Sequence, residues 1–101
     1  MRFEFSSEKN EILKNERNIS FEQIIKSIAD NGVLLDFPHP NADLYPGQRI
    51  FVVEINDYTY CVPYVINKDI IFLKTIFLKT IFLKTIFPSR KFMTLLRKEN
   101  G

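Results

Sequence analysis

The sequence is poor in the side chains that build metal sites and disulfides. Its 101 residues include one cysteine, one histidine and no tryptophan. The single cysteine, Cys61, excludes a disulfide within the chain and is compatible with a reducing cytoplasm. One histidine and one cysteine are too few for a zinc site, and no pattern of carboxylates points to magnesium. We therefore expect a cytoplasmic protein that uses no metal and no cofactor.

Long uninterrupted apolar runs are also missing. The first residues lack the apolar segment of a secretory leader. The most apolar stretch, residues 70–87, is interrupted by three lysines and three threonines. Such a stretch does not make a transmembrane helix, and we expect no association with a membrane.

The net charge is small, but the basic residues are unevenly placed. The formal net charge is +2, and 46% of the residues are apolar, which is enough for one folded domain over residues 1–101. From Lys74 to Lys98 there are seven basic residues and no acidic one. This basic C-terminal third indicates either a solvated face or a polyanionic partner such as RNA.

A tandem repeat dominates the second half of the chain. Residues 71–85 are three identical copies of Ile-Phe-Leu-Lys-Thr, and Ile86-Phe87 begin a fourth. The composition predicts a β-strand, but a continuous strand over residues 70–87 would span roughly 60 Å. Ordinary strands have about five or six residues. We therefore interpret one copy as the native strand and two copies, ten residues, as an insertion.

The odd length of the unit has a consequence for its faces. Side chains of a strand alternate between two faces, so each five-residue copy inverts the pattern. Lys74 and Lys84 are then expected on one face and Lys79 on the other. The unit contains no turn-forming residue. We expect a strand, extended or bulged, that continues past the sheet and pairs with a second molecule, giving a homo-oligomer.

Two helices are predicted before the strands. Ser6 or Ser7 caps a first helix that ends near Glu16. Ser20 and Gln23 form a capping box for a second helix, which ends at the following Asn-Gly pair.

Strands are expected over residues 33–37, 49–55 and 58–66, followed by the repeat strand. Asn56-Asp57 forms a two-residue hairpin turn, and Ser89 caps a last helix after Pro88. The predicted fold is α+β, with two N-terminal helices, an antiparallel β-meander of about four strands and a C-terminal helix.

The hairpin turn also fixes which side chains meet. It pairs Ile55 with Tyr58 and Arg49 with Tyr64, so Arg49 and Tyr64 share a face. Pro63 cannot donate to a strand ladder, which predicts a bulge or an early end of pairing beside it.

Three segments together resemble the BrnT-like toxins of bacterial type II toxin–antitoxin systems. They are Arg17 to Glu22 before the second helix, the strand Val62-Pro63-Tyr64, and the ending from Phe82 to Lys91. The resemblance covers nearly the whole chain apart from ten repeated residues. It implies a RelE-like fold and a ribonuclease that inhibits translation and is neutralised by a cognate antitoxin. By the same resemblance, Tyr64, Lys84 and Arg90 match basic or aromatic positions of the family.

Metal-independent RNA cleavage proceeds when a 2′-hydroxyl attacks the adjacent phosphate. The reaction needs a base, an acid and fixed cations at the phosphorane. We expect the cations from Arg49, Lys84 and Arg90. Proton transfer is expected from His39 or Tyr64, since histidine titrates near neutrality.

Other residues are candidates for holding RNA without reacting with it. Lys74 and Lys91 can contact phosphates, and Tyr60 can stack on a base. Each candidate also has a plain structural interpretation: His39 as a loop residue, the tyrosines as strand formers, and the repeat lysines as guards against aggregation. Arg49 can simply pair with Glu54 or with an acid of a helix.

Three functions are consistent with the sequence. The first is a toxin ribonuclease with RNA and an antitoxin protein as partners. The second is an inactive, repeat-expanded variant whose long strand drives self-assembly. The third is a nucleic-acid-binding module without catalysis.

Overall fold

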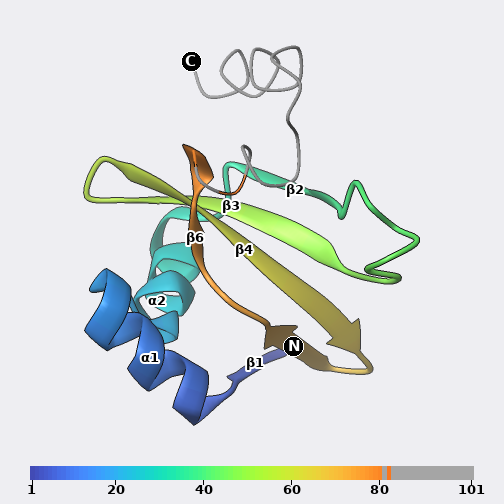
Figure 1. Ribbon diagram of the computed structural model, residues 1–101, viewed down its shortest axis with the longest axis horizontal. Coiled ribbons are helices and arrows are strands. Elements are labelled where there is room, and N and C mark those ends of the chain that lie inside the picture. The colour runs from blue at the N-terminus through green and yellow to red at the C-terminus, as the bar shows by residue number, and fades with distance from the viewer. Residues whose placement is uncertain (81, 83–101) are drawn as a thin grey trace.

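The computed structural model describes residues 1–80 and 82, which fold into a mixed sheet with two helices against one face (Figure 1). The helices are α1 (Ser7–Arg17) and α2 (Phe21–Asn31). The strands are β1 (Arg2–Phe5), β2 (Leu35–Pro38), β3 (Arg49–Ile55), β4 (Tyr58–Asn67), β5 (Ile70–Leu73) and β6 (Phe77–Leu78). Their order in the sheet is β1-β5-β4-β3-β2, and β6 also pairs with β4. The predicted α+β class is confirmed.

Both helices begin at the predicted caps. The Ser6 hydroxyl accepts a hydrogen bond from the Lys9 backbone N–H at 3.1 Å. Ser20 and Gln23 form the expected capping box, with each side chain accepting from the other residue's backbone N–H. Gly32 ends α2 with φ 75°, a value that favours glycine. No helix within the described residues is both long and apolar enough to cross a membrane.

The central hairpin has the predicted register. Asn56 and Asp57 both have positive φ, 51° and 69°, as a two-residue turn between twisted strands requires. Arg49 therefore pairs with Tyr64, and Ile55 with Tyr58. Successive side chains of β3 and β4 alternate between two faces of the sheet.

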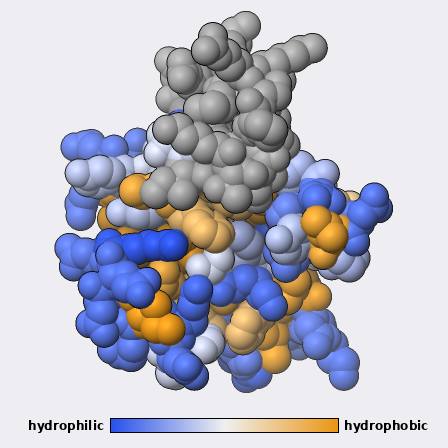
Figure 2. Space-filling model, in the orientation of Figure 1, coloured by the Kyte–Doolittle hydropathy of each residue, from blue (hydrophilic) through white to orange (hydrophobic). Residues whose placement is uncertain are grey.

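The two faces carry separate apolar clusters. The helix face, which α1 and α2 cover, buries Leu13, Ile19, Phe21, Ile24, Phe51, Val53, Val62, Tyr64, Ile71, Leu73 and Ile76. The opposite face buries Ile50, Val52, Cys61 and Phe82. On the side seen in Figure 2, the coloured surface is largely hydrophilic, with apolar residues in separate patches.

The N-terminal segment corrects the predicted meander. The sequence analysis predicts no strand before the first helix, but Arg2–Phe5 form β1, which runs parallel to β5 and pairs Phe3 with Ile71. The described sheet is thus mixed and six-stranded, not an antiparallel meander of about four strands. Phe5 stacks on Phe21 with ring centroids 4.9 Å apart, so β1 is held by a helix and by a strand distant in sequence.

The repeat does not form the continuous strand that its composition predicts. β5 and β6 both pair with β4, through Leu73 with Tyr64 and Phe77 with Cys61. Between these pairs lie two residues of β4 and three residues of the repeat, so the repeat carries one extra residue. This is a bulge opposite Pro63, on the side of β4 that faces β5 and β6. In the hairpin, for which a bulge or an early end of pairing was predicted, the ladder is unbroken, and Pro63 pairs with Ile50. The carbonyl of Pro63 still accepts from the Lys74 N–H at 2.8 Å.

The bulge also overturns the predicted inversion of faces between the first two copies. Ile71 and Ile76 open successive copies, and both lie in the cluster of the helix face. The extra residue offsets the odd length of the unit, so the second copy returns to the phase of the first. After β6, Lys79, Thr80 and Phe82 are helical. Lys84, the third copy beyond Phe82 and the predicted last helix lie outside the described residues.

Candidate functional site

Arg49 and Tyr64 meet at one end of the hairpin, together with an acid that the sequence analysis did not select. The Tyr64 hydroxyl donates to Asp36 Oδ1 at 2.6 Å. Arg49 Nε lies 3.2 Å from Asp36 Oδ1 and 3.2 Å from the Tyr64 hydroxyl, and donates to both oxygens. A second guanidinium nitrogen, Nη2, donates to the Asp36 carbonyl at 3.4 Å. We call these three residues the Asp36–Arg49–Tyr64 cluster.

Three neighbouring strands build this cluster. The register places Asp36 of β2 opposite Phe51 of β3, and Arg49 of β3 opposite Tyr64 of β4. The Tyr64 ring stacks on Phe51 with centroids 3.8 Å apart and planes 8° from parallel. The ring is buried, whereas the side chains of Asp36 and Arg49 are 36% and 38% exposed. A buried phenol therefore anchors an accessible ion pair.

The surroundings fix the charge of the cluster. Burial, aided by the hydrogen bond to Asp36, raises the pKa of Tyr64 to about 12, so its hydroxyl is neutral at pH 7. The hydrogen bond with Tyr64 and the charge of Asp36 raise the pKa of Arg49, in spite of some desolvation. Arg49 is thus a permanent cation with restricted orientation. Such a group can hold a phosphate oxygen or stabilise charge that develops on it.

Asp36 was missed because it sits in a short apolar segment that reads as an ordinary strand. One signal was present: an acid among the apolar residues 33–37 interrupts the pattern. The expected partner of Arg49 was Glu54 or an acid of a helix. Within the described residues, the carboxylate that pairs with Arg49 is that of Asp36.

His39 lies on the loop after β2 and is almost fully buried, with 5% of its surface exposed. Its Nδ1 accepts a hydrogen bond from the Asn41 N–H at 3.0 Å, and its ring stacks on Tyr45 with centroids 4.3 Å apart. Burial lowers the pKa of His39 below its usual value, so the ring is neutral at pH 7. With Nδ1 accepting, the hydrogen of the neutral ring is on Nε2, and the imidazole is a donor there.

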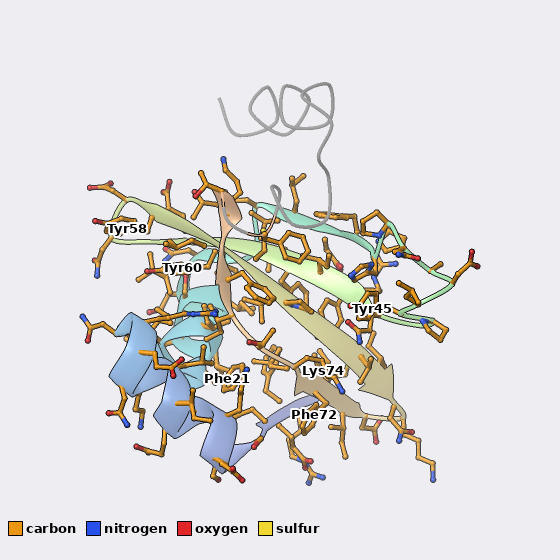
Figure 3. All side chains as sticks on the ribbon, in the orientation of Figure 1. Phe21, Tyr45, Tyr58, Tyr60, Phe72 and Lys74 are labelled. Carbon is orange, nitrogen blue, oxygen red and sulfur yellow. The ribbon has the colours of Figure 1, made fainter. Side chains whose placement is uncertain are left out.

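Lys74 and His39 line the same pocket, on the opposite face of the sheet from the Asp36–Arg49–Tyr64 cluster. The pocket has a volume of about 280 Å³. In Figure 3, Lys74 and Tyr45 lie in one region of the molecule, away from Tyr58 and Tyr60. The structure therefore brings His39 together with Lys74, and Arg49 together with Tyr64, as two separate pairs.

Tyr60 lies in a third place. It lines a recess of about 430 Å³ together with Tyr58, Arg17 and Leu78. Burial raises the pKa of Tyr60. Arg17 donates to the Ile76 carbonyl at 2.6 Å, and its guanidinium carbon lies 5.3 Å from the centre of the Phe77 ring. The recess thus combines aromatic groups with a fixed cation, and the role of Tyr60 in RNA binding stays a prediction.

Three predicted site residues, Lys84, Arg90 and Lys91, lie outside the described residues. Among residues 1–80 and 82, no group of three or more histidine, cysteine, aspartate or glutamate side chains is placed to hold a metal ion. Comparison of the chain with protein-family models, with curated proteins and with solved structures finds no match in any of the three. The function is therefore argued from the chain's own residues.

Proposed function

We propose that the protein is the toxin of a type II toxin–antitoxin pair, a cytoplasmic ribonuclease that cleaves RNA without a metal ion. The proposal is supported by the resemblance of the segments Arg17 to Glu22, Val62 to Tyr64 and Phe82 to Lys91 to BrnT-like toxins. The finer RelE-like identity of the α+β fold belongs to the same proposal. The observation that carries it is the fixed, accessible cation of Arg49, held by Asp36 and Tyr64.

In this mechanism the described residues have distinct tasks. Attack of a 2′-hydroxyl on the neighbouring phosphate adds negative charge to the phosphorane, and the Arg49 guanidinium stabilises it. Asp36 is the adjacent group able to take the hydroxyl proton. Tyr64, neutral and buried, positions both Arg49 and Asp36 through its hydrogen bonds to them. The leaving 5′-oxygen takes its proton from solvent water, and Asp36 releases the proton that it accepted to solvent, so the step balances. We assign the remaining cations at the phosphate to Lys84 and Arg90.

The test is cleavage of total RNA in the presence of a chelator. We expect the unmodified protein to cleave, and Arg49→Ala to lower the rate by about 10²–10³, as loss of one donor to a transition-state anion does. Arg2→Ala is the matched control. Arg2 lies on β1, and among the described residues its side chain forms an ion pair only with the exposed Glu4, at 3.2 Å. Equal activity of Arg49→Ala and Arg2→Ala would remove Arg49 from the site.

The proposed partner of the toxin is an antitoxin protein. The basic C-terminal third and the accessible Arg49 favour an acidic or amphipathic partner that covers the same cations. Co-expression of the neighbouring open reading frame should restore growth to cells that express the toxin. Harmless expression of the toxin alone, with no protein co-purifying, would contradict the pairing.

A specific observation favours a second candidate, RNA binding without catalysis. The Tyr64 hydroxyl donates to Asp36 and has a pKa of about 12, and His39 Nδ1 is occupied by the Asn41 N–H. Neither of the two predicted proton carriers therefore has a lone pair or proton that is easily exchanged at neutral pH. Tight binding of RNA with no cleavage, with or without a chelator, would favour this candidate over the ribonuclease.

A further inference from the structure

The pocket between the His39 loop and the repeat has aromatic walls. Tyr45 and His39 stack on each other, and the His39 ring meets the edge of Phe82 at 6.5 Å between centroids. Phe77 tilts against Phe82 with centroids 5.7 Å apart. Tyr45 is also 43% exposed, so one aromatic ring lies at the solvent side of the pocket. Flat walls of this kind accept a flat ligand by stacking.

Polar groups sit among these rings, and one of them lacks a partner. The Thr75 Oγ1 atom is buried and forms no hydrogen bond with any described residue. A buried hydroxyl without a partner is costly and calls for an explanation. Thr75 lies in the bulge and lines this pocket, together with the polar residues Gln48 and Lys74. A ligand that hydrogen-bonds to Thr75 would satisfy the orphaned hydroxyl.

The size of the pocket limits the ligand. Its volume of about 280 Å³ is near the lower end of small-molecule sites, which run from about 300 to 1,000 Å³. Lys74 has its ammonium 5.6 Å from the centre of the Phe72 ring, outside the aromatic walls. The arrangement suits a small planar base with hydrogen-bonding edges, attached to an anionic group.

We infer that this pocket binds one nucleotide, with the base stacked against Tyr45 and hydrogen-bonded to Thr75, and with the phosphate near Lys74. Two sources supply the same chemistry: a free nucleoside monophosphate, and a single nucleotide within an RNA strand. In the second case the inference rests on the proposed function, and the pocket would hold a base while the strand reaches Arg49 on the other face. Every base has a flat face, so stacking alone tolerates any sequence.

The experiment is a calorimetric titration of the full chain with AMP, GMP, CMP and UMP, and with a single-stranded RNA oligonucleotide. We expect Tyr45→Ala to weaken binding about tenfold, because it removes one stacked ring. Tyr45→Phe keeps the ring and should retain the affinity. Leu44→Ala is the matched control, because Leu44 precedes Tyr45 on the same loop, is 71% exposed and does not line this pocket.

Each result decides between the alternatives. Binding of a mononucleotide that Tyr45→Ala alone weakens supports a site for free nucleotides. Binding of only the oligonucleotide, weakened in the same way, supports a site for a base within RNA. Absence of binding by both probes, or equal weakening by Tyr45→Ala and Leu44→Ala, overturns the inference. Binding of a mononucleotide should be unchanged in Arg49→Ala, because Arg49 lies on the other face of the sheet, so failure of the ribonuclease and failure of this site are distinguishable.

A second variant tests the orphaned hydroxyl directly. Thr75→Val keeps the shape of the side chain and removes the buried polar atom. We expect a higher melting temperature for the free protein, because an unsatisfied group is lost, and weaker nucleotide binding, because the ligand loses a partner. Unchanged nucleotide affinity in Thr75→Val would remove Thr75 from the site. If neither Thr75→Val nor Tyr45→Ala weakens nucleotide binding, the proposed site as a whole is overturned.

Discussion

The Tyr64 hydroxyl holds together the end of the sheet where three strands meet. It donates to Asp36 and accepts from Arg49, while its ring stacks on Phe51. Removing the hydroxyl leaves the stacking intact but deprives a carboxylate and a guanidinium of a shared partner. Hydrogen bonds to charged groups contribute about 1.5–3 kcal/mol each.

We therefore expect Tyr64→Phe to lower the free energy of unfolding by about 1.5–3 kcal/mol. Tyr58→Phe is the control, because Tyr58 is exposed and no hydrogen bond of its hydroxyl occurs within the described part of the chain. Urea unfolding of both variants gives the comparison. Equal stability of the two would mean that the Asp36–Arg49 pair holds the strands without the phenol.

The raised pKa of Tyr64 makes a separate prediction about alkaline solutions. The phenol titrates near 10 in the unfolded chain and at about 12 in the folded protein, so the folded protein binds the proton more tightly. Its contribution to stability is complete below pH 10 and is lost as the pH rises from about 10 to 12. The free energy of unfolding, measured over this pH range, should fall less in Tyr64→Phe than in the unmodified chain. The same pH dependence in both proteins would show that folding does not raise the pKa of the phenol.

Among the elements, the repeat segment is the one whose structure departs most from its composition. β5, the bulge and β6 together use residues 70–78, which amounts to one copy of the unit and the start of the next. Because the copies are identical, deletion of residues 76–80 moves residues 81–87 into positions 76–82. Every position up to 82 then keeps its residue type. The bulge at Lys74 to Ile76 is what keeps Ile76 on the helix face.

This arrangement predicts that truncating one side chain destabilises more than removing five residues. Ile76→Ala leaves a cavity at a fully buried position of the helix face, at a cost of about 2–5 kcal/mol. Deletion of residues 76–80 brings the next copy into the same place and should leave the melting temperature and the circular dichroism of the sheet nearly unchanged. The prediction is refuted if Ile76→Ala is the milder of the two changes.

Elements signalled by neighbouring residues could be predicted, and elements held by distant residues could not. The turn at Asn56-Asp57 and the capping box of Ser20 and Gln23 are local patterns, and both are present as expected. β1 was missed because four residues carry little signal and its partner, β5, lies far along the chain. Pro63 indicated where the pairing is interrupted. It did not indicate that the bulge would return the second copy of the repeat to the same faces as the first.

The candidate site divides in the same way. The pairing of Arg49 with Tyr64 followed from the hairpin register, which is local. Asp36 joins them from β2 across the sheet, and Tyr45 and Thr75 join His39 and Lys74 from separate segments. These contacts depend on the order of the strands in the sheet, and the spacing of residues in the sequence does not determine that order.

At the scale of the whole molecule, the order of the described sheet ends at two outer strands, β1 and β2, and both are protected against pairing with another chain. β6, which pairs with β4 alone, is only two residues long. β2 ends at Pro38, and β1 carries the ion pair of Arg2 and Glu4. Charges and prolines on outer strands oppose association. Any self-assembly of this chain is therefore expected from the copy of the repeat that begins at residue 81, not from the two outer strands.

We expect deletion of residues 71–80, which leaves a single copy, to give a smaller and more soluble species with the same helical content. Ile70, the remaining copy and Ile86-Phe87 then supply the residue types of β5, the bulge and the first position of β6. Light scattering of both proteins measures the difference. If the full-length chain and the deletion are equally monomeric, the repeat does not drive assembly.

The bulge opposite Pro63 has a further consequence for inheritance. A tandem repeat of amino acids is encoded by repeated whole codons, so slippage during replication adds or removes copies without shifting the reading frame. The sheet needs one copy and the first residues of the next, and identical copies replace one another in that place. Alleles with two or more copies would therefore encode the same β5, bulge and β6, and would vary only in the length of chain that follows them.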